Sequence, residues 1–332
     1  MIRSFTQPRR VSVALAAIVV LIFGIWGCST DQSPVAPVTD TSAVLSMANP
    51  MVRSIVPVQE RHTSRLMADP EVIGTAITIG DDGKPAIMVL VTTERARGTV
   101  PADLDGVRTK ILLTDKIVAM GKPGGGTTVS HTAKQTPPIQ LGTSGGWRYD
   151  LANGYCCGGT LGSLINVGGQ QRILSNYHVL EADIVSGGNS RVAATGDFVI
   201  QPGLLDVGCN AANAQNVATL VKTSSLPNSN VDASTATVIS GMVRTDGAIL
   251  EIGTISATTV AAAINQTVKK SGRTSGLTRS YVSGLNASIS VAYENECAGG
   301  SAFTKTFTGQ IIVNGGNGKF LQGGDSGSLL VE

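Results

Sequence analysis

The stretch GTLGSLINVGGQQRILSNYHVL, residues 159–180, contains short apolar runs separated by glycine and polar residues. Similar runs recur from about residue 138 onward, among them FVIQPG, NVATLV, GAILEIGTIS and FTGQIIV, without helical patterns between them. Runs at this spacing predict a closed or sandwiched antiparallel β architecture. The 40 glycines and a charged fraction of only 14% also favour short strands and many turns over long solvated helices. The sequence therefore predicts a mostly β protein.

The first 28 residues have the pattern of an export signal. They start with the basic segment MIRSFTQPRR, continue with the uncharged run VSVALAAIVVLIFGIW and end at Cys28. That run is short for a membrane span of about 20 residues and fits the core of a signal peptide. Gly27 before Cys28 resembles a bacterial lipobox, which implies cleavage before Cys28 and a lipid on its sulfur. We expect an extracytoplasmic protein, anchored to a bacterial membrane or secreted; an ordinary signal peptide and an anchoring helix are the alternatives.

Three segments connect this leader to the β-rich part. Residues 29–49 are small and polar and predict a flexible tether. Residues 50–120 combine a short helical pattern with two β-branched runs around Asp82-Gly83, a strong hairpin signal, and predict a small α+β domain. Residues 121–138 predict a linker, because GKPGGGTT lacks the G-x-x-x-x-G-K-[ST] order of a phosphate loop. The β-rich domain then spans residues 139–332.

Charge and cysteine content exclude several classes of partner. The net charge of +2 gives no reason to expect a nucleic-acid partner. Zinc spacing is lacking, and we expect no metal and no cofactor. Export would permit disulfides among four cysteines, and the favoured bridges run from one or both members of the adjacent pair to one of the other two. Three complete pairings exist, and the sequence does not choose among them: the cysteines are Cys156, Cys157, Cys209 and Cys297.

Of the three histidines, His178 has the setting of a catalytic base. RILSNYHVLE brings a β-type run into a polar break and places His178 at its edge. Histidine suits this role because its unperturbed pKa lies near 6.5. The alternative is a partly buried histidine at a strand end. His62 lies in the predicted helix and His131 in the linker, and we expect both to be solvated.

GGDSGSLLVE, residues 323–332, contains the serine with a nucleophile's setting. An alcohol needs a base to take its proton and an acid partner to orient that base. Glycines on either side of Asp325 and Ser326 remove side chains where the backbone must turn tightly. If the amides of Gly324 and Ser326 point at one spot, they form an oxyanion hole, typically worth about 3 kcal/mol per donor. The alternative is a plain Gly-Ser turn.

The acid partner is predicted to be Asp232, in NSNVDASTATV. An aspartate entering a β-branched run is disfavoured by strand propensity, so its presence indicates a specific role. Its position also keeps the order His, Asp, Ser along the chain. The rivals, each with turn or cap duty as the alternative, are Asp183, Asp197 and Asp206.

Several motifs in one order carry a family resemblance. Residues 140–332 are similar to the chymotrypsin-like (S1-type, trypsin-like) serine proteases, and most closely to the exported bacterial ones, through GTLG, ILSNYHVL, VDA, KKSGRTSGLTRSYVSG and GGDSGSLLV. The resemblance implies a double antiparallel β-barrel and hydrolysis of a protein or peptide substrate through an acyl-enzyme. It implies Ser326 as nucleophile, His178 as general base and acid, and Asp232 as orienting carboxylate. Gly324 and Ser326 would be the oxyanion donors.

Two departures from the family pattern affect the expected function. In the family the serine is followed by strands that complete the second barrel, whereas here only residues 327–332 follow, so we expect a C-terminally truncated protease with an incomplete second barrel. Phe320, six residues before Ser326, is expected near the base of the specificity pocket and disfavours selection of basic residues. The alternative function is a non-catalytic surface lipoprotein that uses this scaffold for binding. In either case we expect residues 50–120 to pack against the protease part.

Overall fold

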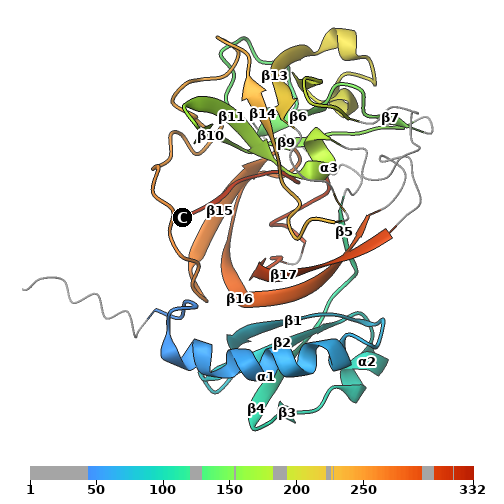
Figure 1. Ribbon diagram of the computed structural model, residues 1–332, viewed down its shortest axis with the longest axis vertical. Coiled ribbons are helices and arrows are strands. Elements are labelled where there is room, and N and C mark those ends of the chain that lie inside the picture. Colours follow the sequence, from blue (N-terminus) through green and yellow to red (C-terminus); the bar gives the residue numbers. More distant parts are fainter. Residues whose placement is uncertain are drawn as a thin grey trace, which may run out of the picture. The chain divides into compact units, whose positions relative to one another are not determined.

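The computed structural model describes residues 44–119, 129–152, 155–181, 193–221, 226, 228–293, 303–316 and 318–332 (Figure 1). These residues belong to one compact unit that spans 40–332. The predicted signal peptide and its Cys28 lie outside the described residues. Within the described part, no helix has the length and apolar character needed to cross a membrane.

Seven strands form the first sheet, in the spatial order β10-β11-β14-β13-β12-β6-β9, and all of its pairs are antiparallel. The first and last strands of this order follow each other along the chain, separated only by Gly162, whose N–H donates to the Leu174 carbonyl at 3.1 Å. The sheet therefore closes on itself as a barrel. The strands are β6 (Thr143–Trp147), β9 (Gly159–Leu161), β10 (Ser163–Val167), β11 (Gln170–Ser175), β12 (Phe198–Gln201), β13 (Gln215–Val221) and β14 (Ser234–Val238).

The barrel closes around an apolar core. Strand residues that alternate inward are almost fully buried there, as the period of two in a strand requires. The core includes Trp147, Leu161, Ile173, Val217 and Ala236.

The second sheet has nine strands, in the order β18-β15-β16-β1-β2-β4-β3, with β17 and β5 also paired to β16. Most of its pairs are antiparallel; β2–β4 and β5–β16 are parallel. The predicted mostly β fold is confirmed, and the two sheets are consistent with the predicted double β-barrel. The strands are β1 (Val72–Ile79), β2 (Pro85–Val91), β3 (Asp103–Leu104), β4 (Val107–Leu113), β5 (Ile117–Ala119), β15 (Thr267–Gly272), β16 (Gly276–Tyr293), β17 (Phe303–Val313) and β18 (Leu330–Val331).

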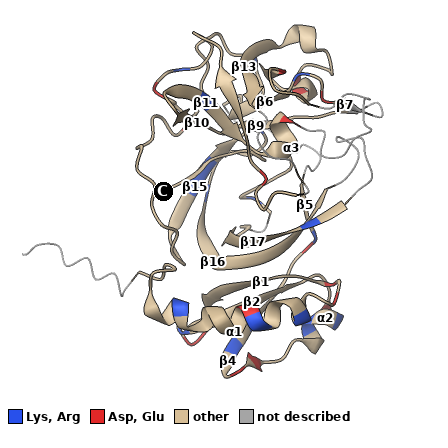
Figure 2. Cartoon of the chain, viewed as in Figure 1, with Lys and Arg blue, Asp and Glu red and all other residues tan. Residues whose placement is uncertain are grey.

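The N-terminal part of this sheet carries two helices, α1 (Pro50–Leu66) and α2 (Glu94–Thr99). Asn49 caps α1, because its side chain accepts from the Met51 N–H at 2.9 Å, and Pro50 occupies the first helical turn. The predicted helix and the predicted β1–β2 hairpin are both confirmed. Figure 2 shows acidic and basic residues mixed on α1, whereas the charged residues of β4 are all basic.

Residues 50–120 pack against the C-terminal part, as expected. β1 pairs antiparallel with β16, with Gly74 opposite Ile289. The buried Gln59 amide donates to the Asn286 carbonyl at 2.9 Å and accepts from the Asn286 side chain at 3.1 Å. The end of the segment predicted as a flexible tether, residues 29–49, also belongs to the folded part. The Ile264 N–H donates to the Leu45 carbonyl at 3.0 Å. One sheet therefore crosses the predicted domain boundary.

A disulfide joins Cys156 to Cys209, 53 residues apart. It agrees with the expectation that the adjacent cysteines bond to distant ones. Cys157 is also disulfide-bonded, and Cys297 lies outside the described residues. The bridge ties β8 (Tyr155–Cys156), which pairs with β7 (Leu151–Ala152), to the segment with the 3-10 turns Leu204–Asp206 and Ala211–Asn213.

Candidate active site

His178 lies in α3 (Tyr177–Leu180), a single helical turn directly after β11. Asn176 begins this turn, and its side-chain amide donates to the Asp232 carbonyl at 2.5 Å. The polar break predicted from the sequence is thus a helical turn, which is hydrogen-bonded to the segment directly before β14 (Ser234–Val238). His178 is only 3% exposed.

The Asp232 carboxylate holds His178 through both of its oxygens. Oδ2 lies 2.5 Å from His178 Nδ1, and Oδ1 accepts from the His178 backbone N–H at 3.2 Å. Burial alone would raise the pKa of Asp232, but the charge and hydrogen bonds of His178 outweigh it and hold that pKa below its ordinary value. Because an ionised carboxylate only accepts hydrogen bonds, Nδ1 carries a proton. In the neutral form of the ring, Nε2 then presents a lone pair.

The Nε2 atom of His178 is buried and has no hydrogen-bond partner among the described residues. Buried polar side-chain atoms are usually paired, so an unpaired one requires an explanation. A nitrogen kept free to accept a proton, as a general base requires, is such an explanation. It also means that the Ser326 hydroxyl does not hydrogen-bond to Nε2 in this structure.

The turn that carries Ser326 is anchored to β9 at Thr160. The Thr160 N–H donates to the Ser326 carbonyl at 2.8 Å, and the Thr160 hydroxyl donates to the Gly324 carbonyl at 2.9 Å. Gly324 has φ +93° and Gly327 has φ +91°, a region that side-chain-bearing residues rarely adopt. Neither the Gly324 N–H nor the Ser326 N–H donates to a backbone carbonyl in the described part of the chain.

Backbone packing at Gly159 places this turn beside the histidine segment. A Cβ at Gly159 would lie 2.5 Å from Val179 Cγ2 and 2.9 Å from the Ser326 carbonyl oxygen. Val179, the residue after His178, therefore contacts the same small area of β9 as Ser326. The structure bonds His178 to Asp232 and brings the Ser326 backbone next to the segment that carries them.

Asp325, between Gly324 and Ser326, is buried in a dense set of donors. Its carboxylate accepts from Lys270 Nζ at 3.0 Å and from the backbone of Thr274 at 2.9 Å. It also accepts from the Ser275 backbone and hydroxyl, and from the Gln322 N–H. Burial would raise the pKa of Asp325, but the Ser275 hydrogen bonds and the Lys270 charge together lower it. Burial lowers the pKa of Lys270 against the pull of Asp325.

The other candidate carboxylates have different partners. Asp206 receives two hydrogen bonds from the Arg273 guanidinium, at 2.7 Å and 2.5 Å. Asp197 accepts from Trp147 Nε1 at 3.1 Å. Asp183 lies outside the described residues. Among the aspartates that the structure describes, Asp232 is therefore the one bonded to His178.

The expectation that His131 is solvated is wrong. His131 is 2% exposed, with Nδ1 2.8 Å from the Gly142 carbonyl and Nε2 2.6 Å from Glu251 Oε2. The chain here runs along the barrel instead of through solvent, because the Ser144 N–H donates to the His131 carbonyl at 2.8 Å. His62, on the N-terminal helix α1, is partly exposed, and its Nε2 lies 2.9 Å from Asp105 Oδ2.

Three contacts near the site were not predicted from the sequence. The Tyr293 hydroxyl donates to Asp232 Oδ2 at 2.9 Å, and Lys270 and Thr160 hold the serine turn. KKSGRTSG and GTLG were recognised as motifs, but nothing in them assigned these roles, and Tyr293 lies in no motif. Phe320 is buried, with Lys270 Nζ 5.9 Å from its ring centroid; its place in a specificity pocket stays a prediction.

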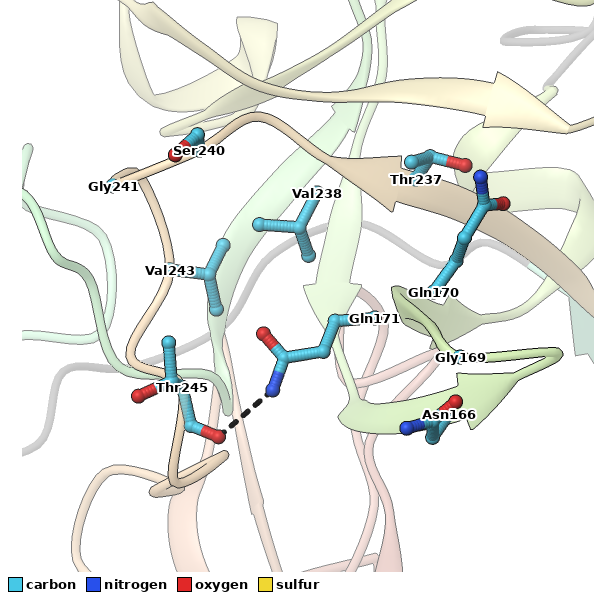
Figure 3. A pocket seen from close by; sticks show the side chains of 10 residues that line it. All are labelled: Asn166, Gly169, Gln170, Gln171, Thr237, Val238, Ser240, Gly241, Val243 and Thr245. Atoms are coloured by element: carbon cyan, nitrogen blue, oxygen red, sulfur yellow. Dashed lines mark hydrogen bonds between the residues drawn. The ribbon is translucent and has the colours of Figure 1, made fainter.

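A pocket of about 550 Å³ lies elsewhere, on the first barrel (Figure 3). Its lining includes Gln170 and Thr237, and Gln171 donates to the Thr245 carbonyl at 2.9 Å across it. None of its lining residues is acidic, basic or a histidine. It therefore offers no general acid or base.

No protein-family model and no curated protein sequence matches this chain. Solved structures do show similarity. One is a glutamic acid specific serine protease that uses a histidine triad in substrate binding: identity is 16%, the match covers 58% of this chain and 80% of that one, and the TM-score is 0.38. Another is Thermobifida fusca Protease A, with 20% identity, coverage of 58% and 77%, and a TM-score of 0.35.

Proposed function

We propose that this protein is an exported serine endopeptidase that cleaves peptide bonds through Ser326, His178 and Asp232. The observation that carries the proposal is the His178–Asp232 pair, with Nδ1 and Oδ2 2.5 Å apart and Nε2 buried without a partner among the described residues. A histidine held in one tautomer by a carboxylate, with its second nitrogen free to accept a proton, is the base that a serine nucleophile requires.

In the proposed reaction, Nε2 of His178 takes the proton of the Ser326 hydroxyl as Oγ attacks the substrate carbonyl. The Gly324 and Ser326 N–H groups donate hydrogen bonds to the developing oxyanion. His178 then returns the proton to the leaving amine, which leaves an acyl group on Oγ. Water, deprotonated by the same nitrogen, hydrolyses this acyl-enzyme and restores Ser326.

The proposal requires Ser326 Oγ to approach Nε2 when substrate binds. Catalytic hydrogen bonds are often long or poorly aligned without substrate and tighten in the complex. The serine turn is held at Thr160 and Asp325, so the proposed adjustment is confined to the Ser326 side chain.

A serine-directed probe tests the proposal. A fluorophosphonate should label the folded full-length protein at Ser326, and Ser326→Ala or His178→Ala should abolish labelling. The matched controls are Ser54→Ala and His62→Ala, both on α1, which should label as the wild type does. Labelling at another serine, or none on a folded protein, contradicts the proposal.

We further propose export with lipid attachment at Cys28. The Cys156–Cys209 disulfide supports the first part, because such bonds persist in oxidising compartments outside the cytoplasm. Metabolic labelling with radioactive palmitate in a bacterial host should mark the wild type and not Cys28→Ala. Equal labelling of the two would contradict lipid attachment.

One observation favours the alternative, a non-catalytic binding protein: the Ser326 hydroxyl makes no hydrogen bond to Nε2. If the scaffold only binds peptides, the folded protein retains a peptide ligand without cleaving it. Hydrolysis of a casein or peptide library by the wild type, lost in Ser326→Ala, rules this alternative out.

A further inference from the structure

The Tyr293 hydroxyl contacts the candidate catalytic pair directly. Tyr293 is 3% exposed, at the end of β16, and its hydroxyl donates to Asp232 Oδ2 at 2.9 Å. The same oxygen lies 2.5 Å from His178 Nδ1. One carboxylate oxygen therefore receives two donors, one from each β body.

Tyr293 is held from three sides. In the sheet it lies between Phe303 of β17 and Ala119 of β5, which pair with it on opposite edges of β16. Its ring stacks on Phe303, with centroids 4.9 Å apart and 9° between the planes. It lies 6.0 Å from the His178 ring, edge to face. The hydroxyl thus has little freedom to leave Asp232.

Burial raises the pKa of Tyr293 far above its ordinary value of 10.0, and the nearby Asp232 charge raises it further. The hydroxyl therefore stays protonated at neutral pH and can donate to the ionised Asp232 carboxylate. The Asp232 side chain is 14% exposed, so water has limited access to replace a lost donor.

We propose that Tyr293 is a positioning residue for the reaction, and this inference rests on the proposed function. Its hydrogen bond fixes the Asp232 carboxylate so that Oδ2 faces His178 Nδ1 and Nε2 remains the base. Without the hydroxyl, Oδ2 keeps His178 as its sole donor in the described structure, and the carboxylate can rotate away from the geometry that orients the ring.

Tyr293→Phe in the full-length protein tests this, because phenylalanine keeps the stack on Phe303 and loses only the hydroxyl. Tyr281→Phe is the matched control: Tyr281 lies on the same strand, is 43% exposed, and accepts from Asn314. We expect Tyr293→Phe to lower kcat for peptide hydrolysis by about 10- to 100-fold, the range for a hydrogen bond to a charged group, with little change in KM. Tyr281→Phe should behave as the wild type.

A second readout does not depend on turnover. The proton between His178 Nδ1 and Asp232 should give a downfield ¹H NMR resonance, assigned by its loss in His178→Ala. We expect Tyr293→Phe to shift this resonance and Tyr281→Phe to leave it in place. In an Asp232→Asn background, Tyr293→Phe should have no further effect on kcat.

The outcomes separate the two proposals. If the wild type neither labels nor hydrolyses, the proposed function fails, while a resonance shift confined to Tyr293→Phe still supports the positioning role. A Tyr293→Phe protein that unfolds at the wild-type temperature and matches Tyr281→Phe in both kcat and resonance position overturns the inference.

Discussion

The Lys270–Asp325 pair is the most sensitive point in the support of the serine turn. Both side chains are at most 2% exposed, and Nζ lies 3.0 Å from Oδ2. Lys270→Met removes the charge but fills much of the same volume. Removing one partner of a buried pair typically costs about 3–5 kcal/mol, because the other charge stays buried. Asp325 keeps its donors from Thr274, Ser275 and Gln322, so we expect the lower end, about 3 kcal/mol.

Urea unfolding followed by Trp147 fluorescence measures this loss, since Trp147 is buried in the barrel core. Lys269→Met is the matched control: Lys269 is the neighbouring residue of β15, on the opposite face and only partly buried. Its free energy of unfolding should stay within about 0.5 kcal/mol of the wild type. Labelling of Ser326 should slow in Lys270→Met alone.

The pH dependence provides a further check. Asp325 has a folded-state pKa below its unfolded value. Its stabilising contribution is therefore present above the unfolded value of about 3.9 and is lost as the pH falls through the lower folded value. Without Lys270, the pKa of Asp325 in the folded protein rises. As the pH falls, Asp325 is therefore protonated in Lys270→Met before it is protonated in the wild type, and the variant loses its unpaired buried charge. The difference between wild type and Lys270→Met should shrink from pH 7 to pH 4. Equal free energies of unfolding for Lys270→Met and Lys269→Met at pH 7 would contradict a stabilising role for the buried Lys270–Asp325 pair.

Three further perturbations have defined outcomes. Gly74→Ala should destabilise by about 1–3 kcal/mol in thermal unfolding, because its Cβ would lie 2.6 Å from Ile289 Cδ1, whereas Gly98→Ala meets no atom within 4 Å and should not destabilise. Cys209→Ser removes a disulfide that closes a loop of 53 residues and should lower the free energy of unfolding in urea by about 4 kcal/mol. Reductant should then lower the free energy of unfolding of this variant less than that of the wild type. Thr160→Val should slow fluorophosphonate labelling by about 10-fold with a stability loss of about 1–3 kcal/mol, since it leaves a buried carbonyl unpaired; unchanged labelling would show that the serine turn does not depend on Thr160.

Much of the fold could be predicted because its signals are local. The α1 helix, the β1–β2 hairpin and the barrel strands follow from apolar periodicity and turn residues within a few positions of each other. The prediction for His131 failed because its Gly- and Pro-rich surroundings indicate a loop but do not show against which surface the loop packs. The pairing of β1 with β16 could not be predicted from local patterns either, because it joins distant parts of the chain. Gln59 and Asn286, which are hydrogen-bonded at this junction, are 227 residues apart.

The residue types of the site can be recognised from the sequence: one histidine at a strand end, one aspartate before a strand, and one serine in a glycine-rich turn. Each is recognisable from its neighbours along the chain, because tight turns and strand ends have local chemical requirements. Which of these groups are in contact becomes known only once the chain is folded. His178 and Asp232 are 54 residues apart, Tyr293 lies 61 residues beyond Asp232, and Lys270 and Asp325 are separated by 55. Contacts at such separations depend on how the two sheets close and pack against each other. The partner of a buried charged group is likewise set by the side chains that surround it in the folded protein.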